Sequence, residues 1–233
     1  PPHPATPDPL WSRGLGDVYK RQVVALVGSS GSGKSTMADL IPRFFETTKG
    51  KIKLDNVDIK DVRIKSLRKL MGIVTQETIL FNDTISGNIA YGQKEIKLSK
   101  IHEAAEAANA KEFIYALRKG FDTVIGEKGV RLSGGQRQRL NISRSIILNS
   151  KILILDDSTS AIDSVTEKKI RECLMEGDSD RITIIISHRL ASLMHANEII
   201  YLEEGKISEQ GSHQELVQQG GHYASLYQLQ TNF

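Results

Sequence analysis

One segment, GSSGSGKST at 28–36, constrains the fold more than any other part of this sequence. It directly follows the apolar run Val23–Val27, and it leads into Lys34–Phe45, where apolar residues recur at helical spacing. Glycines let the backbone curl so that successive N–H groups point inward, and the positive end of a helix dipole adds to the field of these groups. The pattern therefore predicts a buried strand, a loop that cradles phosphate and a helix, in that order.

Each polar group of this loop has an expected task in nucleotide binding. The Lys34 ammonium is expected to reach the β- and γ-phosphates, and the Ser35 hydroxyl to coordinate Mg²⁺. A flexible glycine–serine turn is the alternative, but it leaves a lysine and a hydroxyl at a helix start unexplained. We therefore expect a bound nucleotide to contact Gly28, Ser29, Ser30, Gly31, Ser32, Gly33, Lys34, Ser35 and Thr36.

Strands and helices alternate along the rest of the chain. A mostly helical stretch at roughly 84–148 interrupts this alternation. The predicted fold class is therefore α/β: a phosphate-loop NTPase with a mostly parallel sheet flanked by helices and with an inserted helical subdomain. The further strands are predicted at Lys51–Leu54, Met71–Thr75, Ile152–Leu155, Ile182–Ser187 and Glu198–Leu202, and the further helices at Ile64–Leu70, Ser164–Met175 and Ser212–Gln219.

Composition excludes several other classes of protein. The chain has 31 Lys and Arg and 28 Asp and Glu, and this net charge of +3 is too balanced for a nucleic-acid-binding protein. Cys173 is the single cysteine, so an intrachain disulfide and a cysteine-based zinc site are both excluded. The longest apolar runs are far shorter than the ~18 residues of a membrane span, so this polypeptide is not expected to cross a bilayer.

Polar residues at two strand ends are candidates for catalysis. Asp156 and Asp157 end the strand Ile152–Leu155, and we expect Asp156 to hold Mg²⁺ and Asp157 to polarise the attacking water. The alternative is a pair of acids that caps the next helix, which Ser164 and Glu167 are predicted to start as a capping box. His188 ends another strand, where it is expected to contact the γ-phosphate instead of being an ordinary surface histidine.

A second helix start with open N–H groups is predicted about a hundred residues after the first. Ser133 and Gln136 form a capping box, and Gly134 and Gly135 between them leave the N–H groups of the helix accessible to an anion. One small domain has little use for two such ends on one nucleotide. Two copies that face each other head to tail would use both, by two-fold symmetry.

These motifs together resemble the ATP-binding-cassette (ABC) ATPases. LSGGQ at 132–136 is similar to the signature of that family, and the phosphate loop, Gln76, the acidic strand end, Ser160–Asp163 and His188 stand in the family's order from Gln22 to the C-terminus. The resemblance implies that ATP and Mg²⁺ are bound, that Gln76 senses both the γ-phosphate and Mg²⁺, and that Asp163 lies at a dimer interface. It further implies that the partner's ATP is covered by Leu132, Ser133, Gly134, Gly135 and Gln136.

Two segments are similar to exporter-type members in particular: Phe81–Ile85 and the T-x-x-G-E-x-G pattern at Thr123–Gly129. The resemblance implies an ATPase whose dimer closure drives export, located at the cytoplasmic face of a membrane. Its partners would be a second cassette and transmembrane domains absent from this fragment, while the transported substrate stays open. The alternatives are a soluble ABC ATPase of translation or DNA repair, and a nucleotide-binding module with little hydrolysis.

Two departures from the family pattern modify this prediction. Residues 1–21 hold five of the six prolines, and we interpret them as a non-native or disordered head before an ABC ATPase domain at 22–233. The family's adenine-stacking aromatic has no counterpart at the matching spacing. Asp157 stands where hydrolysing members have glutamate, which predicts weak hydrolysis at this site. We interpret the chain as one half of a heterodimer, with an ordinary homodimer as the alternative.

Overall fold

The computed structural model describes residues 22–93, 95–176 and 181–231, so the predicted head at 1–21 lies outside the described residues. The chain divides into two compact units. Unit 1 holds the residues up to Arg68 together with those from Ile182 onward, and unit 2 holds Lys69–Arg181. Each unit contains part of the predicted site.

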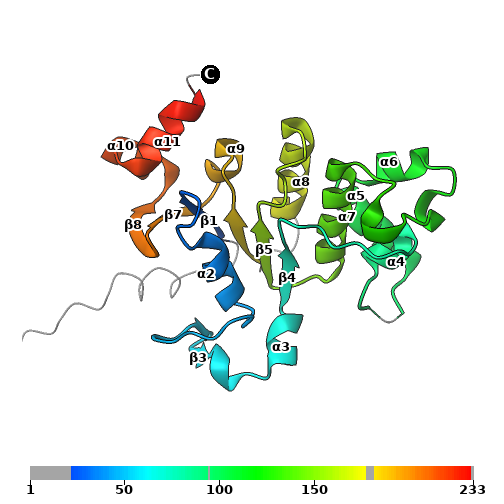
Figure 1. The fold of residues 1–233 in the computed structure, drawn as a ribbon, viewed down its shortest axis with the longest axis horizontal. Helices are drawn as coiled ribbons and strands as arrows, with labels where there is room; N and C mark the ends of the chain where they lie inside the picture. The colour runs from blue at the N-terminus through cyan, green and yellow to red at the C-terminus, as the bar shows by residue number, and fades with distance from the viewer. Residues whose placement is uncertain (1–21, 94, 177–180, 232–233) are drawn as a thin grey trace, which may run out of the picture. The chain divides into compact units, whose positions relative to one another are not determined.

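The main sheet of unit 1 includes β1 (Val23–Gly28), β6 (Ile182–Ile186), β7 (Glu198–Glu203) and β8 (Lys206–Gly211) (Figure 1). β1 lies between β6 and β7 and is parallel to both, and β8 pairs antiparallel with β7. The predicted parallel strands are confirmed. β8 has no apolar run, because it is a partly exposed strand, and the sequence pattern did not predict it.

The core of unit 1 joins this sheet to the C-terminal helices α9 (Leu190–Leu193), α10 (His213–Gln219) and α11 (His222–Thr231). Tyr223 of α11 is fully buried, and its hydroxyl is 2.8 Å from Nδ1 of His213. Burial raises the pKa of the Tyr223 phenol to about 12, so it stays protonated at neutral pH. The buried cluster consists of Ala25, Val27, Leu193, Ala196, Ile199, Leu216 and Tyr223.

The helix after the phosphate loop, α2 (Lys34–Leu40), is shorter than the predicted Lys34–Phe45. Pro42 has no N–H group to continue the helical hydrogen bonds. Arg43 then takes a left-handed φ of 55°, and the N–H of Phe44 donates to the carbonyl of Asp39 (3.0 Å). The sequence prediction of this helix end was wrong because it followed apolar spacing past the proline.

A short hairpin follows, formed by β2 (Lys53–Leu54) and β3 (Val57–Asp58). Its two turn residues, Asp55 and Asn56, have φ values of 48° and 65°, as a tight two-residue hairpin turn requires. The 3₁₀ turn η1 (Ile59–Asp61) and helix α3 (Ile64–Lys69) complete this part of the chain.

Unit 2 combines two parallel strands with a group of helices (Figure 1). The strands are β4 (Met71–Val74) and β5 (Ile152–Asp156), and the helix α8 (Ser164–Glu176) follows β5. Among the described residues of either unit, no helix has both the length and the apolarity to span a membrane. Within the predicted helical stretch lie α4 (Ile85–Ile89), α5 (Leu98–Ala107), α6 (Lys111–Ala116), η2 (Gly120–Asp122), η3 (Glu127–Gly129) and α7 (Gly134–Ile147).

Helix α7 is the central element of this helical group, since it contacts α4, α5 and β4. Its buried Leu140 belongs to a cluster that draws on every helix from α4 to α7. The members of this cluster are Leu80, Ile85, Ile89, Ile101, Ala104, Ala105, Ala110, Phe113, Ile114, Phe121, Ile125, Leu132 and Leu140. The start of α7 is therefore anchored in a continuous apolar core.

Candidate functional site

The phosphate loop of unit 1 has the backbone conformation that its glycines predict. Gly33 caps α2 with a left-handed φ of 101°, and it has no side chain to accept a hydrogen bond from the helix. The helix start is therefore open to an external acceptor such as phosphate. The rest of the loop is held by two backbone bonds, from the N–H of Ser32 to the carbonyl of Ser29 (3.2 Å) and from the N–H of Gly205 to the carbonyl of Ser32 (3.1 Å).

Only glycine fits at the point where β1 enters the loop. Gly28 has a φ of 146°, and a β-carbon there would lie 2.1 Å from the carbonyl oxygen of Leu202 on the neighbouring β7. This distance is far inside van der Waals contact, and the Leu202 carbonyl belongs to the backbone of the strand paired with β1. The first glycine of the motif is thus required by packing within unit 1 as well as by the curl of the loop.

The side chain of Lys34 lies folded inside the loop. Its Nζ donates to the carbonyls of Gly28 (2.9 Å) and Ser29 (2.7 Å), and it lies 3.3 Å from Oγ of Ser32. Lys34 is buried, so its charge is held where the loop surrounds it. The structure thus fixes the ammonium group within the loop, and its contact with phosphate stays a prediction.

His188 lies at the same sheet edge of unit 1 as the phosphate loop. β1 and β6 are parallel, with Leu26 opposite Ile186, so their carboxyl ends meet at one edge. His188 is exposed, and its carbonyl accepts a hydrogen bond from Nε2 of Gln230 on α11 (2.7 Å). The imidazole is accessible to a ligand, while the backbone behind it is tied to the C-terminal helix.

In unit 2, three predicted residues lie at or just after the carboxyl ends of β4 and β5. These strands are parallel, with Val74 opposite Leu155, so Gln76, Asp156 and Asp157 lie at one edge. Gln76 is exposed, and both aspartates are half-buried. Asp157 has a left-handed φ of 45°, a conformation that aspartate tolerates better than most residues.

The signature segment begins α7 as predicted. Oγ of Ser133 accepts from the N–H of Gln136 (3.3 Å), and Oε1 of Gln136 accepts from the N–H of Ser133 (2.9 Å), which completes the capping box. Leu132 is buried in the core of unit 2, and its carbonyl accepts from Nη1 of Arg137 (2.6 Å). Ser133 is exposed, so a rigid helix start is presented to the solvent.

The second signature glycine has a role that the sequence did not indicate. A β-carbon on Gly135 would lie 2.8 Å from the carbonyl oxygen of Ala161, in the loop after β5. The loop at 158–163 therefore packs directly on the start of α7. Gly134 is less restricted, since its β-carbon would be 3.4 Å from Cβ of Ala161.

Asp163 is the residue that caps α8. Its Oδ1 accepts from the N–H of Thr166 (2.9 Å), and hydrogen bonds from Thr166 lower the pKa of the Asp163 carboxyl. The predicted capping box of Ser164 and Glu167 is wrong, because Ser164 is already the first residue of the helix and Glu167 is buried. Asp163 is exposed and ends the loop that packs on the start of α7. This exposure is compatible with the predicted position of Asp163 at a dimer interface.

Sequence reasoning missed an aromatic pair held by an arginine. The rings of Phe81 and Tyr91 stack with centroids 4.1 Å apart, and the Arg144 guanidinium lies 5.5 Å and 5.4 Å from them. Arg144 donates from Nε to the carbonyl of Asn88 (2.8 Å) and from Nη1 to that of Ile79 (2.7 Å). An arginine four residues after Leu140, on the buried side of α7, was the available signal.

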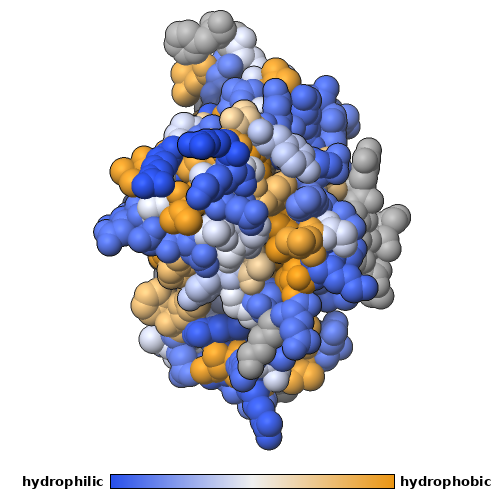
Figure 2. All heavy atoms as spheres, turned by 90° about the vertical axis from the view of Figure 1, so that its right-hand side faces the viewer, coloured by the Kyte–Doolittle hydropathy of each residue, from blue (hydrophilic) through white to orange (hydrophobic). Residues whose placement is uncertain are grey.

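The two exporter-like segments lie side by side in unit 2. Thr84 bridges to Val124, and the N–H of Ile85 donates to the carbonyl of Thr123 (3.0 Å). Apolar side chains around them are exposed, and Figure 2 shows such residues in small groups among polar ones on the visible face. We call the set Ile79, Phe81, Tyr91, Val124 and Val130 the apolar patch.

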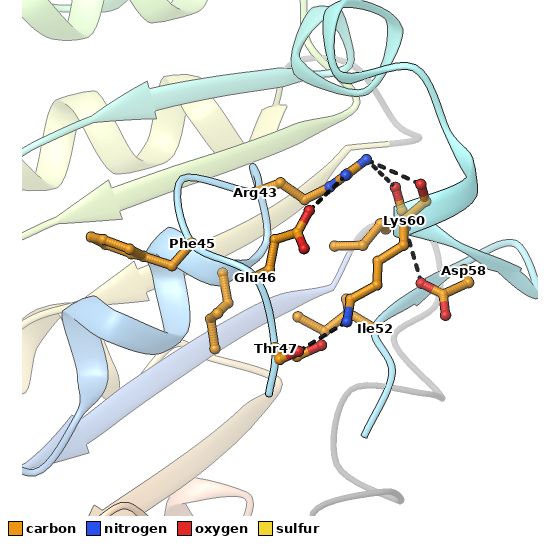
Figure 3. A pocket seen from close by; sticks show the side chains of 9 residues that line it. Arg43, Phe45, Glu46, Thr47, Ile52, Asp58 and Lys60 are labelled. Atoms are coloured by element: carbon orange, nitrogen blue, oxygen red, sulfur yellow. Dashed lines mark hydrogen bonds and ion pairs between the residues drawn. The ribbon is translucent and has the colours of Figure 1, made fainter. Parts of the chain in front are cut away.

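In a pocket of unit 1, the cationic side chains of Arg43 and Lys60 bond to neighbouring residues of the same unit (Figure 3). Nη1 of Arg43 donates to the carbonyls of Ile59 and Val62 (3.0 Å each), and Nη2 pairs with Glu46 (3.1 Å). Nζ of Lys60 donates to the carbonyl of Thr47 (2.9 Å). These bonds fix the end of α2 to the segment after the hairpin.

Comparison with known proteins decides the family. Residues 15–160, more than half of the chain, match the family described as ABC transporter. The chain belongs to the ABC transporter family. The phosphate-loop α/β fold predicted from the motifs of this ABC chain is thereby confirmed, and so is the family resemblance.

Individual ABC transporter proteins are also similar to this chain. The ATP-dependent lipid A-core flippase of Chromobacterium violaceum is 48% identical over 214 residues, which are 92% of this chain and 37% of that protein. That of Legionella pneumophila is 52% identical over 207 residues, 89% of this chain and 35% of that protein. A solved bacterial Atm1-family ABC exporter with ATP bound is 43% identical, with a TM-score of 0.88 over 91% of this chain and 37% of its own. The chain thus spans little more than a third of these proteins.

Proposed function

We propose that this chain is the ATP-binding and ATP-hydrolysing cassette of an exporter that works as a dimer of cassettes. The observation that carries the proposal is the presence in one chain of two helix starts with N–H groups left for an anion: Gly33 caps α2 without a side chain, and the capping box at Ser133 takes up only the N–H groups of Ser133 and Gln136. A head-to-tail pair of cassettes has a use for both, since each ATP would contact one start from either copy. ATP-dependent closure of such a pair is the step that would move attached membrane domains.

Phosphoryl transfer needs some residues that bind the phosphates and Mg²⁺ and others that act on the reacting groups. The loop at 28–36 would hold the phosphates, with Lys34 on the β- and γ-groups. Ser35, Gln76 and Asp156 offer hydroxyl, amide and carboxylate oxygens, which are the ligands Mg²⁺ prefers, and Mg²⁺ there would neutralise phosphate charge.

The groups nearest the reaction are Asp157, His188 and the partner's signature. Asp157 would orient and polarise the attacking water, and His188 would contact the γ-phosphate. Ser133 and the N–H groups after it would bind the ATP of the other copy, with Asp163 at the interface. Because Asp157 is one methylene shorter than glutamate, we propose weak hydrolysis here and a heterodimer in which the partner supplies the stronger site.

The apolar patch is the proposed contact with the membrane domains. Its Phe81–Tyr91 stack is rigid, since Arg144 holds both rings, and it adjoins the Thr84–Val124 bridge of the two exporter-like segments. Such a patch on an otherwise charged surface fits a protein partner. We propose that the cassette works at the cytoplasmic face of a membrane, and the flippase relatives make lipid A-core the first transport substrate to test.

The test is the steady-state ATPase rate of this chain against its own concentration, with Lys34→Ala and Ser133→Ala beside it. A homodimer of this chain predicts a rate that rises faster than linearly with protein, whereas the heterodimer half proposed here predicts a low rate for the chain alone. Lys34→Ala should lose ATP binding, whereas Ser133→Ala should bind ATP and fail to hydrolyse it. A rate that is linear in protein and unaffected by Ser133→Ala would contradict the proposal.

A further inference from the structure

Gln138, in the second turn of α7, bonds to the 158–163 loop through both ends of its side-chain amide. Nε2 donates to Oγ of Ser160 (3.0 Å), and Oε1 accepts from the N–H of Ala161 (2.9 Å). The side chain is 6% exposed, so water does not replace these bonds easily. A buried amide that is satisfied at both ends has one geometry, and this one holds the loop against the helix.

A second, independent contact joins the same two segments. The carbonyl of Ala161 approaches Gly135 so closely that a β-carbon there would be 2.8 Å away. Backbone of the loop therefore lies against backbone of the signature turn, with the Gln138 amide one helical turn further along. The loop then ends at Asp163, which caps α8.

The helix itself does not need these bonds. Its start is closed by the capping box of Ser133 and Gln136, and its apolar side is anchored by Leu132 and Leu140. Among the described residues, the Gln138 side chain bonds to Oγ of Ser160 and to the N–H of Ala161, both in the loop. The Gln138 side chain therefore fixes the position of the 158–163 loop relative to the start of α7.

We propose that Gln138 is a positioning residue that makes the signature turn and the 158–163 loop close over the partner's ATP as one surface. This inference rests on the proposed dimer function, since it gives the two surfaces a common partner. Without Gln138, the signature turn and Asp163 could each reach the partner, but in variable relative positions. We expect the binding of ATP to the chain's own phosphate loop to stay unchanged, because both bonds of the Gln138 side chain go to the 158–163 loop.

The variant that tests this is Gln138→Leu, which keeps the size of the side chain and removes both hydrogen bonds. We expect at least a ten-fold weaker ATP-induced dimer by sedimentation and a kcat lowered by up to ~100-fold, the effect of a displacement of about 1 Å. The affinity of the monomer for a fluorescent ATP analogue should stay within two-fold of wild type. Gln138→Glu should restore most of the dimer, because its carboxylate accepts from the Ala161 N–H and from the Ser160 hydroxyl.

The matched control is Ser143→Ala. Ser143 is a buried polar residue of the same helix, and its Oγ donates only to the Arg139 carbonyl within that helix (2.8 Å). It should leave dimerisation and kcat unchanged. Should Gln138→Leu fail to fold, Ser160→Ala on the exposed end of the same contact removes one bond and should weaken the dimer to a smaller extent.

Three results would overturn the inference while leaving the function intact. The first two are a Gln138→Leu variant that dimerises like wild type and a Ser143→Ala variant that is equally weakened. Loss of analogue binding in Gln138→Leu would also overturn it, since that shows general damage. A wild-type chain that neither binds ATP through Lys34 nor dimerises with it would instead refute the proposed function itself.

Discussion

Replacement of Asp157 by glutamate should raise ATP turnover at the cost of a little stability. The residue follows β5 with a φ of 45°, and its carbonyl accepts from the N–H of Ser160 (3.3 Å), so the backbone is held while the side chain lengthens. One added carbon–carbon bond moves the carboxylate by about 1.5 Å. A displacement of about 1 Å can change a rate ~100-fold, so we expect kcat to rise by about 10- to 100-fold.

The same substitution has an expected effect on folding. Glutamate lacks the local hydrogen bonding that lets aspartate occupy the left-handed region, and this difference amounts to about 1 kcal/mol. In a protein of this size, 1 kcal/mol lowers the unfolding midpoint by about 2–4 °C. A faster enzyme that unfolds slightly earlier is thus the expected combination.

The assay is steady-state ATPase at saturating ATP, with Lys34→Ala as the blank and Asp157→Asn as the isosteric control without a carboxylate. Thermal unfolding of the same samples reports the second effect. Asp157→Asn should be slower than wild type. If Asp157→Glu folds and binds ATP but shows no gain, the reach of this carboxylate does not limit hydrolysis, and the argument for a weakened site fails.

Three further predictions concern stability and binding. Arg144→Met should lower the free energy of unfolding by about 2–4 kcal/mol, because the two oxygens of Asn88 lose the charged group that donates to them. Urea titration measures this change, and an unchanged midpoint of urea unfolding would contradict it. Gly28→Ala should abolish binding of a fluorescent ATP analogue, since its β-carbon meets the Leu202 carbonyl at 2.1 Å, and retained affinity would show that the loop can shift. Asp163 has a lowered pKa in the folded state, so its stabilisation is complete above the ordinary aspartate value near 3.9 and is lost as the pH falls through the lowered pKa. The stability of Asp163→Asn should accordingly fall less below pH ~4 than the stability of wild type. Identical stability profiles of the two proteins against pH would exclude a role for this carboxyl.

Nearby residues were sufficient to predict several elements of this chain correctly. The strand before the phosphate loop and the capping box of Ser133 and Gln136 both appear in the structure. Each depends on interactions within about four residues along the chain, which a single sequence displays directly. The motif order was also enough to indicate the family, which the match at 15–160 confirms.

The sequence predictions of individual elements failed where two local patterns competed or where a strand left no apolar pattern. Apolar spacing predicted a helix up to Phe45, but Pro42 removed a backbone donor and ended it. Ser164 and Glu167 matched a capping pattern, yet Asp163 one residue earlier took the cap. β8 had no apolar run, because a partly exposed strand needs few buried side chains.

The sequence by itself determined which groups are available for chemistry: the glycine-rich loop with Lys34, the acids after β5 and the signature at the start of α7. Tertiary structure alone decided what holds them. Arg144 reaches back across more than fifty residues to Asn88, and Gln138 reaches forward to Ala161. Such partners are joined by packing of separate elements, and their separation along the chain leaves no periodicity from which the contact can be predicted.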